Sequence, residues 1–474
     1  NTEGVRILLD ANAVVNTDPI LTEGVTALDE AIRIKDSAIR QEIVHLLLRA
    51  GAYIKSPKNQ EQYAPLHGAV RENDLEMTRK LLEKGADPNV GFCVRTKLTP
   101  LQKASSQGNE SLVLLLVNFG ADVNSRPYKF EGRTALQAAA EKGHASIVKM
   151  LLTLGANIKA QRAHRNGVSA IEAVVGRCDQ ELFQLFLDKE PDIISSDPIA
   201  KCRVIELALK CWKCDVPFLE LLLKAGAAAD HVPFSASQIS ILQIAVQRHN
   251  YRVAQCLLSG GANVNHWCEA DSSTRATALQ AAVYGRDVDA VQALLESGAD
   301  INAPASNNGG KTALQIAVSQ NNVVMTKLLM HHGADVNGLP SLRRGRTALQ
   351  EAASSGFVHL TEYLLACGAH VNAPAAHFGG VTALQGAALH GNIRIVMMLL
   401  RAGAHINGAP AIEQGRSAIE GATENGRLDT LHLLLSYHPD TDEFEIRKIR
   451  AVKLALANGH LAIGRFLLAY RKRT

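Results

Sequence analysis

Residues 132–156 read GRTALQAAAEKGHASIVKMLLTLGA, and this stretch decides the fold. Thr134 and Gln137 have the spacing of a capping box, in which two side chains bond backbone N–H groups at a helix start. Leucine and alanine then recur at helical spacing, and Gly143 supplies the left-handed residue that ends a helix. A second apolar helix follows and ends at Gly155. The stretch therefore predicts two short antiparallel helices.

The same pattern recurs along the chain with a period close to 35 residues. Its anchor residue moves from Leu101 to Leu136 and then to Ile171 in steps of 35. Neither helix can hide its apolar face alone, so the units must stack to form a core. We therefore predict an all-α array of helix-turn-helix units with hairpin-like loops over residues 1–474. We expect a half repeat at 1–16 and about thirteen repeats, which start near residues 26, 64, 99, 134, 169, 203, 240, 277, 312, 347, 382, 417 and 450.

Composition limits the function classes. The 474 residues are 47% apolar but only 4% aromatic, which fits a core of alanine, leucine, valine and isoleucine. A net charge of +4, from 50 basic and 46 acidic residues, is a weak footprint for nucleic-acid binding. No apolar run is long enough to span a membrane. Eight cysteines are too sparse for a disulfide framework, so we expect an intracellular, cytoplasmic protein, with the nucleus as the alternative.

The motifs resemble those of the ankyrin repeat over essentially the whole chain. They are Ala64-Pro-Leu-His67, Thr99-Pro-Leu-Gln102 and the Gly-Ala-Asp-Val-Asn strings at 120–124 and 333–337. The resemblance implies an ankyrin-repeat solenoid that binds proteins and has no catalytic activity. In two respects the chain departs from the family, because Gln or Glu replaces the usual His in most copies and the period is about two residues longer.

This variant resembles the long arrays of filamentous-fungal multidomain proteins, which often have an NTPase module upstream. The chain begins without Met and with half a repeat, so we expect a fragment of a larger protein. The leading hypothesis is a protein-binding scaffold, and the alternative is a ligand-sensing or autoregulatory arm of a receptor-like NTPase protein. Nucleic-acid binding and a purely structural spacer are the weaker rivals.

No catalytic, cofactor or metal site is predicted, because the chain lacks a phosphate-binding loop, a metalloprotease motif and a catalytic triad pattern. Cys211 and Cys214 form a CxxC pair with Cys202 and His231 nearby in sequence. Zinc binding or a redox pair are the alternatives to a structural role, but the second half of a strong zinc pattern is missing. We interpret these cysteines as structural.

Function in a repeat array resides in the hairpin tips and the ends of the first helices, which vary while the frame stays constant. Exposed aromatic and basic residues are the usual anchors of an interface. The alternative for each ring is that it packs on the next tip. The predicted partner-binding residues, on the concave surface of a monomeric array, are Arg126, Tyr128, Lys129, Phe130, Arg162, His164, Arg165, Phe234, Trp267, Arg248 and Tyr284. Charge reversal at Arg126, Arg162 and Arg165 is expected to abolish partner capture without lowering the melting temperature.

Two further features of the repeats carry expectations. The asparagines that end the Gly-Ala-Asp-Val-Asn strings are expected to organise each hairpin through side-chain to backbone bonds, and in some family members such asparagines are hydroxylated. The pattern is irregular around Asp192, where the array is expected to bend or loosen. It is irregular again after Pro439, where residues 443–450 form a charged segment with helical character.

Overall fold

A computed structural model of the chain describes residues 1–16, 26–54, 65–92, 97–211, 214–230, 232, 239–267, 277–305, 309–341, 345–409, 411, 415–437 and 442–470. These residues form 27 helices, which confirms the predicted all-α class. After α1, the helices α2 to α27 follow one another as thirteen pairs. By its internal contacts the chain divides into two compact units, Asn1–Ala228 and Ala229–Thr474.

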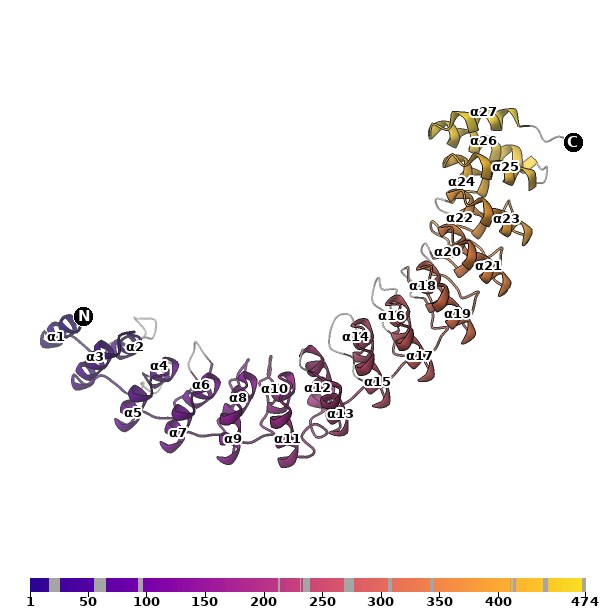
Figure 1. Cartoon of the computed structure of the whole chain (residues 1–474). Coiled ribbons are helices and arrows are strands. Elements are labelled where there is room, and N and C mark those ends of the chain that lie inside the picture. Colours follow the sequence, from indigo (N-terminus) through magenta and orange to yellow (C-terminus); the bar gives the residue numbers. More distant parts are fainter. Residues whose placement is uncertain are drawn as a thin grey trace. The chain divides into compact units, whose positions relative to one another are not determined.

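The first unit contains α1 to α13, drawn in indigo to magenta in Figure 1. Each pair consists of two short helices, and α12 is longer than the other first helices of this unit. The bounds are α1 Thr2–Asp10, α2 Ala27–Ile32, α3 Ser37–Arg49, α4 Pro65–Arg71, α5 Leu75–Glu83, α6 Pro100–Gln107, α7 Glu110–Asn118, α8 Ala135–Lys142, α9 Ala145–Thr153, α10 Ala170–Gly176, α11 Gln180–Lys189, α12 Pro198–Lys210 and α13 Val216–Lys224.

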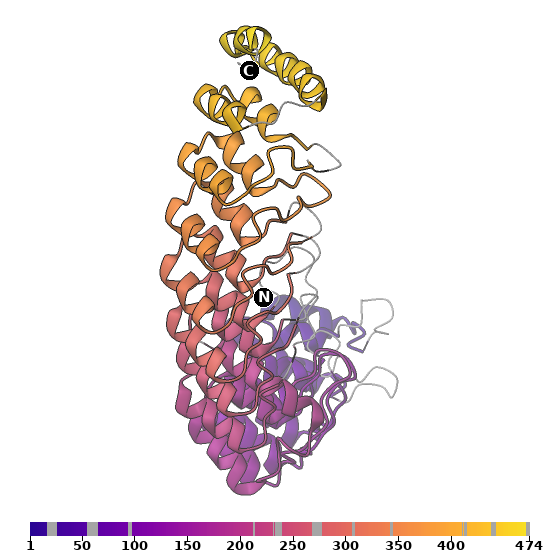
Figure 2. The same cartoon turned by 90° about the vertical axis from the view of Figure 1, so that its right-hand side faces the viewer.

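The second unit contains α14 to α27. Figure 2 shows its first and second helices on one side and the connections between pairs on the other. The bounds are α14 Ile241–Gln247, α15 Tyr251–Ser259, α16 Ala278–Tyr284, α17 Val288–Glu296, α18 Ala313–Ser319, α19 Val323–His331, α20 Ala348–Ser355, α21 Val358–Ala366, α22 Ala383–His390, α23 Ile393–Arg401, α24 Ala418–Glu424, α25 Leu428–Tyr437, α26 Asp442–Ala457 and α27 Leu461–Ala469.

The core of each unit lies between neighbouring first helices and between the two helices of a pair. In the pair α8 and α9, Leu136, Ala139, Ile147 and Leu151 are all buried. Alanine at these positions lets α8 approach α6 and α10 closely, because it has no side chain beyond Cβ. Gly143 adopts φ 79° and ends α8, as the sequence predicts.

Within the described residues, nine of the first helices begin with the predicted capping box. In the box of α8, the Thr134 hydroxyl accepts from the Gln137 backbone N–H at 3.2 Å, and the Gln137 Oε1 accepts from the Thr134 N–H at 3.0 Å. The Gln137 side-chain amide also donates to the backbone carbonyls of Ala160 and Gln161, at 3.0 and 3.3 Å. The glutamine that replaces the family's usual histidine thus caps its own helix and also binds the next repeat.

The asparagine side chains form the expected bonds to backbone groups, and these backbone groups belong to the next repeat. The Asn124 side chain donates to the Gly155 carbonyl at 3.0 Å and accepts from the Asn157 N–H at 2.7 Å. Both partners lie one repeat further along the chain. We call this pair of bonds the asparagine clamp. The other described residues that make it in full are Asn16, Asn89, Asn265, Asn302, Asn337 and Asn372.

Two repeats begin earlier than the period predicts. Helix α12 starts at Pro198 rather than near residue 203, and α26 starts at Asp442 rather than near residue 450. The connection before α12 is short, and it packs Ile193 and Ile194 into the core. The expected loosening around Asp192 is therefore not what the structure shows within the first unit.

Candidate partner-binding surface

The tip between α7 and α8 presents basic and aromatic side chains from one short stretch. Arg126, Lys129 and Phe130 are exposed. Tyr128 is half-buried because its ring packs edge-on against Phe92 of the preceding tip, with 5.3 Å between ring centroids. The alternative of packing between tips therefore holds for Tyr128. Phe130 stays 41% exposed, with the Lys129 ammonium 5.5 Å from its ring centroid, a distance typical of cation–π contacts.

Backbone hydrogen bonds join this tip to the next one. Residues Phe130 and Arg165 form a parallel bridge. The Glu131 N–H donates to the Arg165 carbonyl at 2.9 Å, and the His164 N–H donates to the Lys129 carbonyl at 3.0 Å. The side chains of His164 and Arg165 are exposed. We call the joined surface of Arg126, Tyr128, Lys129, Phe130, His164 and Arg165 the basic tip surface.

The cations of the basic tip surface have no acidic partner in the described part of the chain. Glu131 is the nearest acid in sequence, but it pairs with Lys97 at 3.2 Å. Hydrogen bonds from Lys97 and Asn166 lower the pKa of Glu131. No carboxylate among the described residues lies within ion-pair distance of the Arg126, Lys129 or Arg165 side chains. Three positive charges are therefore left for a partner.

Arg162 does not belong to this surface, although the sequence pattern groups it there. Its side chain is only 16% exposed, and its guanidinium binds the carboxylate of Glu172 at 2.9 Å and that of Asp197. Glu172 is buried and is the capping-box residue of α10. Charge reversal at Arg162 would remove one of the two cations of the buried Glu172 carboxylate and place a negative charge beside it, so the expectation of an unchanged melting temperature cannot include this residue.

Glu172 needs arginine because it lacks the side-chain N–H groups of glutamine. Where Gln137 donates to two carbonyls of the next tip, Glu172 accepts instead from Arg162 and from Arg203 of α12, the latter at 3.3 Å. The second unit repeats this exchange, since Glu420 of α24 accepts from Arg450 of α26 at 3.1 Å. Both glutamates precede a long first helix, and that helix carries an arginine partner.

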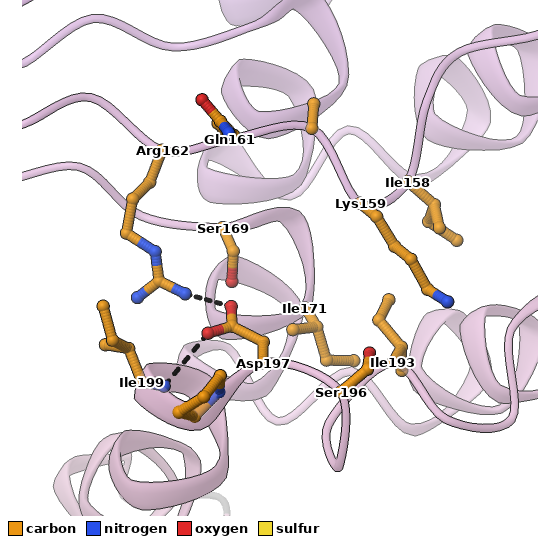
Figure 3. A pocket seen from close by; sticks show the side chains of 12 residues that line it. Ile158, Lys159, Gln161, Arg162, Ser169, Ile171, Ile193, Ser196, Asp197 and Ile199 are labelled. Carbon is orange, nitrogen blue, oxygen red and sulfur yellow. Dashed lines mark hydrogen bonds and ion pairs between the residues drawn. The ribbon is translucent and has the colours of Figure 1, made fainter.

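A pocket of about 510 Å³ lies beside the basic tip surface in the first unit (Figure 3). It exists because residues 154–169 join α9 to α10, whereas the shorter stretch 190–197 joins α11 to α12 and does not cover the preceding tip. Its apolar wall consists of Ile158, Ile171, Ile193, Pro198 and Ile199. We call it the aliphatic pocket.

Ion pairs border the aliphatic pocket. In Figure 3 the Arg162 guanidinium reaches across to Asp197, which also caps α12 through the Ile199 N–H at 3.0 Å. On another side, the Lys159 ammonium binds Glu190 at 2.8 Å and Asp192 at 2.9 Å. These bonds raise the pKa of Lys159, and the bond to Lys159 lowers the pKa of Asp192. Lys159 stands where other repeats have the clamp asparagine.

The remaining predicted residues fall in the second unit or outside the description. Arg248 and Tyr284 are exposed near the ends of α14 and α16, and the Tyr284 carbonyl accepts from the Gln320 side chain at 2.7 Å. Trp267 is 40% exposed. Phe234 lies outside the described residues. These positions stay predictions of partner contacts, and the structure groups none of them with the basic tip surface.

The thiols of Cys211 and Cys214 lie close to a third thiol, that of Cys178, which the CxxC motif does not include. Burial, and then hydrogen bonding to Cys211, raise the pKa of Cys178, and Cys214 adds to this effect. Cys178 and Cys211 are 33 residues apart, close to one repeat, which is the signal that places them together. His231 lies outside the described residues. In the part of the chain that is described, no three Cys, His, Asp or Glu side chains are placed to share a metal ion.

Comparison with known proteins gives matches over most of the chain. The family description "Ankyrin repeats (3 copies)" fits residues 1–92, 66–162, 205–305 and 303–375, and "Ankyrin repeat" fits 379–409. The stretches 163–204 and 410–474, which contain both glutamate boxes, lie outside these matches. None of the described helices is both long and apolar enough to cross a bilayer.

Two curated proteins are similar to parts of the chain. A putative ankyrin repeat protein of fowlpox virus is 33% identical over 117 residues, which is 25% of this chain and 25% of the viral protein. The mouse ankyrin repeat and SOCS box protein 14 is 36% identical over 86 residues, 18% of this chain and 14% of the mouse protein. The resemblance to fungal arrays stays a prediction. From the family matches and the stacked helix pairs, the chain belongs to the ankyrin-repeat family.

Proposed function

We propose that the chain is a non-catalytic scaffold that binds another protein, or another domain of its own parent chain, through the basic tip surface. Ankyrin repeats are generally protein-interaction modules. The observation that carries the proposal is the set of cations without acidic partners among the described residues, Arg126, Lys129 and Arg165, beside the exposed ring of Phe130. Basic and aromatic side chains held on a rigid frame are typical anchors of a protein interface.

The backbone that holds these side chains in place also favours binding. The two tips are joined by backbone hydrogen bonds, and Tyr128 is wedged between Phe92 and Phe130. A partner that binds here therefore orders few side chains beyond the three cations, which reduces the entropy lost on association. The surface favours an acidic partner because its charges are of one sign.

The test is capture of partners by the protein and by a triple charge-reversal variant, Arg126→Glu, Lys129→Glu and Arg165→Glu. Arg162 is left unchanged because it has a structural role. A matched control reverses three exposed cations of the second unit, Arg394, Arg401 and Lys453. We expect the first variant to lose at least about tenfold in capture and the control to retain it, with both melting temperatures close to that of the parent. Equal capture by both variants would contradict the proposal.

Two finer possibilities make different predictions for the same variants. If the chain is an autoregulatory arm of a receptor-like NTPase protein, the triple variant should release a contact with a domain of the same parent and change that domain's NTPase rate. If the tips bind nucleic acid, binding should weaken steeply as salt rises, because phosphate contacts release counterions. A protein partner with a mixed interface gives a shallower salt dependence.

A further inference from the structure

The aliphatic pocket is a hollow beside the basic tip surface, at the point where the connection before α12 is short. Ile158, Ile171 and Ile193 are buried within its wall, whereas Ile199 is 50% exposed at its edge. The volume of about 510 Å³ exceeds what one aliphatic side chain occupies and lies within the range of ligand pockets in proteins. An apolar side chain from a partner would therefore find a preformed place there.

The charges around the pocket are already matched. Asp197 pairs with Arg162, and Glu190 and Asp192 both pair with Lys159. Buried Glu172 takes Arg162 and Arg203. The pocket rim thus has no unpaired cation among the described residues to attract a ligand carboxylate, so acidic groups of a ligand must bind elsewhere.

The unpaired cations lie on the same loop system. Residues 158–165 form one wall of the pocket through Ile158 and Gln161 and carry His164 and Arg165 at their far end. Arg165 forms a backbone bridge with Phe130, so Lys129, which precedes Phe130, lies next to Arg165. An extended peptide rises about 3.3 Å per residue, and a few residues are therefore enough to reach from the pocket to these cations.

We propose that the aliphatic pocket takes a leucine or isoleucine side chain from an extended acidic segment of the protein partner, whose carboxylates pair with Arg126, Lys129 and Arg165. This inference rests on the proposed function and adds the chemistry of the bound segment. The aliphatic side chain supplies the specificity, because exposed cations alone accept any acidic surface.

The direct test uses a fluorescein-labelled peptide, Glu-Asp-Gly-Leu-Gly-Asp-Glu, which reads the same in both directions and so does not depend on binding polarity. A second peptide has alanine in place of leucine. We expect the leucine peptide to bind at least about tenfold more tightly, because three buried carbon atoms distinguish the two side chains. Isoleucine-methyl NMR spectra of the full chain should show shifts at Ile158, Ile171, Ile193 and Ile199 with the leucine peptide only. Equal affinities, or no binding by either peptide at millimolar concentration, would overturn the inference.

Variants separate the pocket from the cations. Ser196 lines the pocket and is exposed, so Ser196→Trp fills the hollow without entering the core. Ser146→Trp, at an exposed position of α9 that does not line the pocket, is the matched control. We expect Ser196→Trp to abolish the preference for leucine over alanine, and the control to leave it unchanged. A leucine preference that survives in Ser196→Trp would refute the pocket assignment.

The outcomes for the two proposals are distinct. If the triple charge reversal abolishes partner capture while the leucine preference is absent, the proposed function stands and the pocket inference fails. If the triple charge reversal leaves partner capture intact, the proposed function fails whatever the peptides do. A single-stranded oligothymidylate that binds tightly at low salt, equally well in Ser196→Trp, in the absence of peptide binding would identify a nucleic-acid surface and overturn the inference.

Discussion

The junction between α8 and α10 and the next junction, between α10 and α12, use the same two positions with different side chains. At the first, Asn124 clamps the turn that follows α9, and Gln137 binds carbonyls of the tip before α10. At the second, Lys159 binds Glu190 and Asp192, and Glu172 binds arginines. Neutral amide bonds at one junction are thus replaced by ion pairs at its neighbour.

The difference follows from the length of the connection. A glutamine amide needs carbonyls of a full-length tip, and the short stretch 190–197 before α12 does not supply them to α10. Instead, Arg203 of the long helix α12 binds Glu172. In the second unit, Glu420 pairs with Arg450, and Asn407 accepts from Arg447, both from the long helix α26. Glutamate in the capping box therefore indicates a long first helix in the following repeat.

The largest effect is expected from removing both cations of Glu172. The double variant Arg162→Ala and Arg203→Ala leaves a buried carboxylate uncompensated, which costs about 3–5 kcal/mol of unfolding free energy. Urea denaturation followed by circular dichroism measures this loss. The control, Arg126→Ala with Arg165→Ala, removes two exposed arginines and should change stability by less than about 0.5 kcal/mol. Similar losses in the two double variants would mean that the ion pairs do not hold the junction.

A third residue type at the box position predicts a pH effect. His67 occupies the position of Gln102 and Gln137, and burial lowers its pKa from 6.5 to about 4. Because the folded pKa is the lower one, its contribution is complete above pH 6.5 and is lost as pH falls from 6.5 towards 4. The loss totals about 3 kcal/mol, at about 1.4 kcal/mol per pH unit. His67→Gln should remove this part of the pH dependence of the urea midpoint, and an unchanged slope would exclude His67 as its source.

An exchange of box residues tests the comparison at smaller scale. Gln137→Glu places a carboxylate opposite the carbonyls of Ala160 and Gln161 and should cost about 2 kcal/mol. Glu172→Gln keeps an acceptor for the arginines and should cost less. Thermal and urea unfolding of both single variants give the ranking. If Glu172→Gln were the more destabilising of the two, the length of the following connection would not explain why glutamate replaces glutamine in this capping box.

The smallest effect is expected at Lys159. The Lys159→Met variant loses two exposed ion pairs, which salt screens, so its destabilisation should be slight and should disappear at 1 M NaCl. The matched change in a neutral clamp, Asn124→Met, should destabilise equally at low and high salt. A Lys159→Met effect that persists in high salt would place its origin in packing instead of charge.

Much of the fold follows from local patterns in the sequence. The Ser/Thr-x-x-Gln/Glu boxes, the glycines that end helices and the 35-residue period predict the helix pairs that the structure contains. The period, with Ile205 as its anchor, predicts the start of α12 too late, whereas Asp197 followed by Pro198 is the local start signal. The family matches also omit residues 163–204.

The site was less accessible to sequence reasoning. Exposure of Arg126, Lys129 and Arg165 follows from their place in hairpin tips. The structural role of Arg162 does not, since its partners Glu172 and Asp197 lie 10 and 35 residues away and become neighbours only when the repeats stack. The aliphatic pocket forms because the connection 190–197 is shorter than the connection 154–169 of the preceding repeat. An alignment of repeats shows this difference only as a gap.

The asparagine clamp also makes the repeats distinguishable by hydrogen exchange. Each full clamp engages one backbone N–H on an exposed residue that would otherwise exchange rapidly with solvent. Such an amide is protected only while its repeat is docked on the preceding one, so its exchange rate measures the opening of one junction. Among the described residues, these amides belong to Tyr53, Asp122, Asn157, Asp300, Asp335, His370 and His405. Their rates would show, junction by junction, where unfolding begins in each unit and how far it spreads.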